Sequence, residues 1–124
     1  MKICITSTGD NLDSTVDPRF GRCKFFIIVD PDTMEFESIS NENISASGGA
    51  GIKAGQLISE KKVKAVLTGN VGPNAFQTLN AAKIDIFSGI NGTIKDAAIK
   101  YKNGELKQVN GPSVKSHFGM KGGS

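Results

Sequence analysis

The sequence lacks the features that mark secreted, membrane-spanning and zinc-binding proteins. Its longest apolar run, FFIIV at residues 25–29, is far too short to cross a membrane. The first residues, MKICITS, form a strand-like pattern without the long apolar segment of a signal peptide. There are only two cysteines, no C-x-x-C pair and a single histidine, His117, so zinc-type spacing is absent and a structural disulfide is not expected. We therefore expect a cytoplasmic protein that does not contact membranes.

Catalytic motifs and nucleic-acid-binding features are also missing. The net charge is a mild +3, and no basic stripe with interleaved aromatic residues is present, so we expect no nucleic-acid partner. The chain contains neither a G-x-S-x-G motif nor a P-loop. The first strand-like segment, KICITS, carries no carboxylate of the kind that a two-metal nuclease needs. The sequence therefore predicts a binding protein and not an enzyme.

The apolar pattern predicts an α/β fold with the element order βββαβαβα. Strands are expected at 2–7, 24–30, 34–39, 64–68 and 84–87, with a short extra strand at 105–109, and helices at 50–62, after 73 and after 93. Looped connections make the first three strands antiparallel, whereas a helical crossover makes the fourth and fifth parallel. We expect one domain at 1–109 and a flexible Gly-, Ser- and Lys-rich tail at 110–124.

Five polar or Gly-rich loops are expected to meet at the carboxyl edge of this mixed sheet, where α/β proteins bind ligands. They are residues 7–10, 19–23, 47–51, 69–72 and 88–92. Helix N-termini at this edge offer unpaired N–H groups and the positive end of the helix dipole. The candidate residues of this anion-binding site are Arg19, Arg22, Cys23, Gly49, Gly51, Gly69, Asn70 and Gly72. Neighbouring arginines are expected to lower the pKa of Cys23, whose thiolate could bind a soft metal.

Each of these features also has a purely structural interpretation. GAGIKA at 49–54 matches G-x-G-x-x-A, but it does not follow the first strand, so loop-to-helix packing is favoured over a dinucleotide site. Cys4 alternates with apolar neighbours and is favoured as a core residue. Cys23 can equally be structural. The arginines can simply pair with nearby carboxylates, which belong to Asp10, Asp13 and Asp17.

Three segments together resemble the dinitrogenase iron–molybdenum cofactor biosynthesis family. They are VDPRFGRCKFFIIVD at 16–30, the stretch from SASGGAG to KIDIF at 45–87, and NGTIKDAAIKYKNGEL at 91–106. The resemblance extends from residue 1 to about residue 109. It implies a ribonuclease H-like fold, with a five-stranded mixed sheet of order 3-2-1-4-5 flanked by helices. It also implies that the chain carries an iron–sulfur or iron–molybdenum cluster between donor and acceptor proteins of cluster assembly.

The segment RFGR departs from the pattern that this resemblance implies. Nitrogenase-linked members have a His-Phe-Gly-His-type segment, but Arg19 and Arg22 occupy both imidazole positions, and Arg cannot ligate metal as His does. Cys23 is then the nearest candidate metal ligand. His117, in SHFGMKGG, is a further candidate cofactor-binding residue or else part of a loose tail. A phosphate- or nucleotide-binding regulator and a ligand-free interaction adaptor are the alternatives to a cluster carrier.

Overall fold

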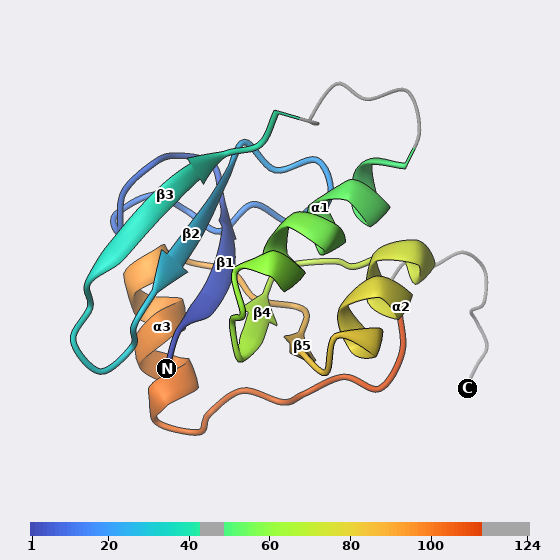
Figure 1. Cartoon of the computed structure of the whole chain (residues 1–124). Helices are drawn as coiled ribbons and strands as arrows, with labels where there is room; N and C mark the ends of the chain where they lie inside the picture. Colours follow the sequence, from blue (N-terminus) through green and yellow to red (C-terminus); the bar gives the residue numbers. More distant parts are fainter. Residues whose placement is uncertain (43–48, 113–124) are drawn as a thin grey trace.

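The protein is a three-layer α/β structure (Figure 1), and the computed structural model describes residues 1–42 and 49–112. Helices α1 and α2 cover one face of a five-stranded sheet, and α3 covers the other. The elements are β1 (Ile3–Ser7), β2 (Phe25–Val29), β3 (Phe36–Ser40), α1 (Ala50–Glu60), β4 (Ala65–Leu67), α2 (Pro73–Ala81), β5 (Asp85–Phe87) and α3 (Ile94–Lys102). His117 and most of the expected tail at 110–124 lie outside the described residues.

The sheet has the order β3-β2-β1-β4-β5, which confirms the expected 3-2-1-4-5 arrangement. β1 is antiparallel to β2, as predicted from the connections, and parallel to β4. β2 pairs antiparallel with β3, and β4 pairs parallel with β5. The carboxyl ends of β1 and β4 and the start of β2 therefore meet at one edge of the sheet, and the candidate site is built there.

Alternation along the strands divides the core into two clusters on opposite faces of the sheet. In β1, Ile3 and Ile5 face α3, whereas Cys4 faces α1 and α2, and all three side chains are fully buried. The α1 and α2 side is completed by residues that include Phe26, Val66, Ala54, Ile58, Ala75 and Leu79. Because helices cover both faces, β1 is buried along its whole length, including the polar residues Thr6 and Ser7 at its end.

Two strand predictions are wrong for reasons of backbone geometry. Met34 has a φ of 64°, a left-handed conformation that a strand cannot contain, so β3 begins at Phe36 and not at residue 34. The segment 105–109 forms no strand in the described part of the chain. One backbone bond, from Val109 N–H to the Ile86 carbonyl (2.8 Å), joins it to β5, and a ladder requires several.

The helix boundaries agree better with the sequence signals. The Thr93 hydroxyl accepts a hydrogen bond from the Asp96 N–H (3.1 Å), as expected for an N-cap three residues before an acidic residue. Gly104 lies in the left-handed region just beyond α3. α2 ends at Ala81, and Ala82 just beyond it is exposed. None of the helices in the described ranges has the length and hydrophobicity needed to span a membrane.

Candidate functional site

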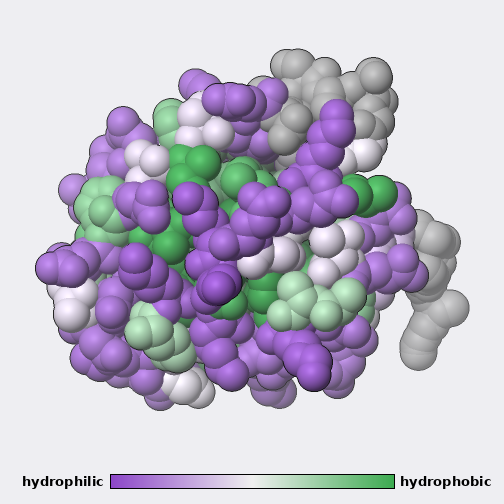
Figure 2. Space-filling model, in the orientation of Figure 1, coloured by the Kyte–Doolittle hydropathy of each residue, from purple (hydrophilic) through white to green (hydrophobic). Residues whose placement is uncertain are grey.

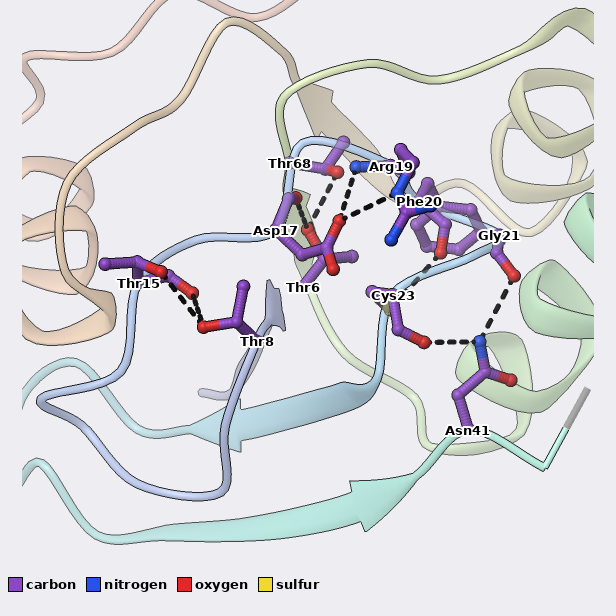
Figure 3. A network of polar contacts seen from close by, with 10 residues as sticks. All are labelled: Thr6, Thr8, Thr15, Asp17, Arg19, Phe20, Gly21, Cys23, Asn41 and Thr68. Atoms are coloured by element: carbon purple, nitrogen blue, oxygen red, sulfur yellow. Dashed lines mark hydrogen bonds and ion pairs between the residues drawn. The ribbon is translucent and has the colours of Figure 1, made fainter. Parts of the chain in front are cut away.

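Residues 17–23, called here the crossing segment, run across the carboxyl ends of β1 and β4 (Figure 3). Asp17 N–H donates to the Thr6 carbonyl at the end of β1 (2.9 Å). Phe20 N–H donates to the carbonyl of Asn70, just beyond β4 (3.2 Å). The segment is therefore attached by its backbone to both central strands before it enters β2.

Buried side chains hold the first half of the crossing segment to the sheet. The Thr6 hydroxyl donates to the backbone carbonyl of Asp17 (2.7 Å) and lies 2.8 Å from the Thr68 hydroxyl, and both threonines are fully buried. Phe20 is only 2% exposed, and its ring centroid lies 5.8 Å from that of Phe26. Phe20 therefore anchors the loop in the core.

Asn41, which follows β3, ties down the second half of the crossing segment. Its side-chain amide donates to the carbonyls of Gly21 (3.1 Å) and Cys23 (2.8 Å). The Cys23 thiol in turn donates to the Phe20 carbonyl (3.3 Å), so the loop is closed on itself (Figure 3). Nothing in the sequence indicated this role of Asn41, because one amide in a loop of polar residues carries no local signal of it.

A cavity of about 300 Å³ opens beside the crossing segment. Three stretches form its walls: residues 20–22 of the crossing segment, residues 49–52 at the start of α1, and residues 72–75 at the start of α2. The first and last of these stretches lie about fifty residues apart in the sequence, and they meet around one space. The meeting point lies at the carboxyl edge of the sheet, where the sequence predicted a site.

The walls of this cavity are positive in character. Both helices begin after a glycine, Gly49 and Gly72, and neither has a side-chain cap, so the N–H groups of their first turns lack the usual side-chain acceptor, apart from Pro73, which has no N–H. The positive ends of both helix dipoles point to the same place, which favours an anion. The half-buried Arg22 adds a guanidinium to the wall. The arrangement can bind a negatively charged group through backbone donors and one fixed cation.

Close backbone packing holds the crossing segment against α1. A Cβ atom on Gly21 would lie 2.9 Å from both Cα and N of Gly51, which is closer than side-chain carbons come to other atoms. A Cβ atom on Gly51 would in turn lie 3.3 Å from the Cβ of Ala75 in α2. These glycines are therefore explained by close approach as well as by the cavity that they line.

The structure brings together only part of the predicted site. Four of the nine predicted residues line the cavity: Arg22, Gly49, Gly51 and Gly72. Gly69 and Asn70 lie beneath the crossing segment, where Asn70 forms a parallel bridge with Arg19. The loops at 7–10 and 88–92 follow β1 and β5 at the same edge, where Gly89 N–H donates to the Gly69 carbonyl (2.8 Å), but they do not line this cavity. His117 lies outside the described residues, and its role stays a prediction.

Arg19 is engaged by a neighbouring carboxylate and does not line the cavity. Its Nε lies 3.4 Å from Oδ1 of Asp17, and the same oxygen accepts the Arg19 backbone N–H (2.9 Å). The Asp17 side chain is buried, whereas that of Arg19 is 62% exposed. The pairing with a nearby aspartate, which the sequence left open, is thus the arrangement found for Arg19.

Cys23 is a buried thiol, and the expected lowering of its pKa is wrong. Burial, followed by the charge of Asp17, raises the pKa of Cys23 to about 12, and the opposing effect of Arg19 is smaller. Neither Cys4 nor Cys23 forms a disulfide, as expected. Within the described residues, no group of three or more His, Cys, Asp or Glu side chains could hold a metal ion. A ligand role for Cys23 stays a prediction.

We expect native Cys23 to react with iodoacetamide at pH 8 on the order of 100-fold more slowly than in urea, because burial blocks access to the thiol and suppresses its thiolate form.

The raised pKa of Cys23 also makes the free energy of unfolding depend on pH. The folded value of about 12 exceeds the ordinary 9.0, so the stabilisation is present below pH 9 and is lost as pH rises from 9 toward 12.

Mass spectrometry of labelled peptides measures the reaction at Cys23, and urea unfolding from pH 7 to 10.5 measures the linkage. Cys23→Ala is the control, and its unfolding free energy should fall less steeply above pH 9 than that of the wild type. Equal labelling rates in buffer and in urea would contradict the burial of this thiol.

Comparison with known proteins gives consistent matches over most of the chain. The apo form of the orange protein from Desulfovibrio gigas is 38% identical, with a TM-score of 0.88 over 91% of this chain and 96% of that one. A NifB-like protein from Thermotoga is 32% identical, with a TM-score of 0.79 over 93% and 98% of the two chains. An uncharacterized protein of Methanocaldococcus jannaschii is 28% identical over 111 residues, which are 87% of this chain and 91% of the relative.

The match to a protein family covers the whole fold described above. Residues 1–104 match the family described as dinitrogenase iron-molybdenum cofactor. This range includes all five strands, all three helices, the crossing segment and the cavity. The chain therefore belongs to the dinitrogenase iron-molybdenum cofactor family.

Proposed function

We propose that this protein is a non-catalytic carrier of an anionic metal cluster, of the iron–sulfur or iron–molybdenum cofactor type. Membership of the family and similarity to the orange protein indicate a cofactor-binding or carrier role. The main support for a binding site is the cavity, where two helix N-termini without side-chain caps meet Arg22. Backbone N–H groups and a guanidinium suit a polyanion that is held without covalent ligands.

In this proposal Arg22 supplies fixed charge, and the first turns of α1 and α2, after Gly49 and Gly72, supply N–H donors. Gly51 has no side chain, which lets the first turn of α1 pack closely against the backbone of the crossing segment. Arg19, Gly69 and Asn70 act indirectly, by holding that segment in place. Cys23 would become a metal ligand only if the segment opened, because its thiol is buried here. His117 is kept as a candidate donor.

Several broader features belong to the same proposal. We treat residues 1–109 as one cofactor-biosynthesis domain with a ribonuclease H-like fold, an assignment supported by the strand order. The carrier would work in the cytoplasm, between donor and acceptor proteins of cluster assembly. We propose no catalytic step, because the cavity walls in the described part of the chain present amides and a guanidinium and carry no acid, base or nucleophile.

Anaerobic loading tests the proposal. Wild-type protein is mixed with iron and sulfide, or with isolated iron–molybdenum cofactor, and uptake is followed by visible absorption and electron paramagnetic resonance. Arg22→Ala is expected to bind about tenfold to a hundredfold more weakly, since a charge-assisted hydrogen bond is lost. Lys24→Ala removes an exposed cation two residues away and should load like the wild type. Cys23→Ala separates a ligand role from a structural one.

Failure of the wild type to load, under conditions where an established carrier does, would overturn the cluster assignment. The cavity would then point to the alternative of a phosphate- or nucleotide-binding regulator, because helix N-termini also suit phosphate. Calorimetric titration with a nucleotide checks that alternative. Absence of binding to either class of ligand would leave the adaptor interpretation.

A further inference from the structure

The outer edge of β3 is open for strand addition. β3 pairs with β2 on one side, and no other strand in the described residues pairs with it. At its two ends, the Glu35 carbonyl accepts from Asp30 N–H (2.9 Å) and Asn41 N–H donates to the Lys24 carbonyl (3.0 Å). In an antiparallel pair, every second residue directs its backbone N–H and C=O toward the neighbouring strand. The residues of β3 whose backbone groups point away from β2 are therefore Phe36, Ser38 and Ser40.

The opposite edge of the sheet, at β5, is partly covered by the chain. At β5, the backbone N–H of Val109 donates to the Ile86 carbonyl (2.8 Å). The Gln108 side chain also donates to Asp85 Oδ1 (3.1 Å). The segment after α3 therefore covers part of the β5 edge, whereas the described chain leaves β3 without such a cover.

Two hollows, together called here the groove, lie beside the open edge on the α1 side of the sheet. One hollow of about 250 Å³ is lined by Ile39 and Ser40 of β3, by Glu42 just after β3, and by Leu57 of α1. A second hollow of about 230 Å³ is lined by Ile28 and Phe36 together with four charged residues, Lys2, Asp30, Glu35 and Glu37. Figure 2 shows hydrophobic surface in the region of β2, β3 and α1, surrounded by hydrophilic residues.

The rim of this groove is acidic, although the whole chain carries a net charge of +3. Glu35, Glu37 and Glu42 are exposed along it, and the one basic residue among the lining residues of the two hollows is Lys2. A second copy of β3 would bring like charges together, which disfavours self-pairing at this edge. The charge instead fits a basic partner.

We propose that β3 and this groove bind an extended basic segment of a partner protein, which adds to the sheet as a strand antiparallel to β3. Glu35, Glu37 and Ile39 are two residues apart and share the α1 side of the sheet. The bound strand therefore carries an apolar side chain opposite Ile39 and Lys or Arg opposite Glu37 and Glu35. The inference does not depend on the proposed carrier function.

Fluorescence anisotropy with a labelled synthetic peptide, GVTVTKTKTG, tests this surface, and GVTVTETETG is the charge-reversed control. Wild-type protein is expected to bind the first peptide and not the second. Glu37→Lys should weaken binding about tenfold by reversing one charge pair. Glu60→Lys makes the same charge change at the end of α1, outside the groove, and should leave binding unchanged.

Ser38→Pro tests strand addition itself, because proline removes an outward N–H that β2 does not use. It should abolish peptide binding while circular dichroism stays native. Binding of both peptides alike, no binding, or binding unaffected by Glu37→Lys and Ser38→Pro would each overturn the proposal. A wild-type dimer that Ser38→Pro dissociates in light scattering would also overturn it, by making a second copy the partner. Arg22→Ala should bind the peptide normally, which separates this test from that of the carrier function.

Discussion

Replacing Phe20 with alanine is expected to lower the free energy of unfolding by about 3–5 kcal/mol, the range found when a buried aromatic side chain is removed. The ring is 2% exposed and lies in the cluster beneath α1 and α2, next to Phe26. Its backbone N–H also holds the crossing segment to Asn70. Loss of the ring would therefore weaken both the core and one wall of the cavity.

Urea unfolding followed by circular dichroism measures this effect. Phe36→Ala is the matched control, because Phe36 lies on the edge strand and is 42% exposed, so its loss should cost less than about 1 kcal/mol. Equal destabilisation by the two substitutions would contradict the role of Phe20 as the anchor of the crossing segment.

Gly69→Ala is expected to destabilise the fold by about 3 kcal/mol through overpacking against a fixed backbone. A Cβ atom at this position would lie 2.5 Å from the Cα of Pro18 and 2.9 Å from its carbonyl oxygen. Pro18 cannot move away freely, because its carbonyl accepts the Asn70 N–H (2.7 Å). The substitution would push the crossing segment off the end of β4.

Thermal unfolding gives the measurement, with a decrease in Tm of about 10 °C expected for a chain of this length. Gly111→Ala serves as the control, since a Cβ there meets no atom within 4 Å. A Gly69→Ala protein as stable as this control would show that the contact with Pro18 is easily relieved. Anion binding should fall together with Tm, because Arg22 reaches the cavity through this segment.

Local patterns in the sequence were sufficient to predict the architecture. Alternation with a period of two marked β1, a continuous apolar run marked β2, and spacings of three and four marked the buried faces of α1 and α3. Short-range rules determine such features, because a side chain's direction repeats with the helix or strand that contains it. Strand directions followed from the connections, and the complete strand order followed from the family resemblance.

The site could be predicted only as a region. Arg19, Arg22 and Cys23 are chemically plausible ligand-binding residues within one short stretch, and nothing local distinguishes them. The fold turns Arg22 toward the cavity, pairs Arg19 with Asp17 and buries the Cys23 thiol. These differences depend on the path of a non-repetitive loop, which long-range contacts determine.

The sequence by itself thus determined the order of elements and the edge of the sheet at which the loops gather, because both follow from periodicity and connection rules. Only the tertiary structure decided which loops meet around the cavity. The close approach of Gly21 to Gly51 is one of the contacts that bring them together. It also decided that the β5 edge is partly covered and that β3 is open. Contacts of this kind join residues far apart in the chain, so no local pattern encodes them.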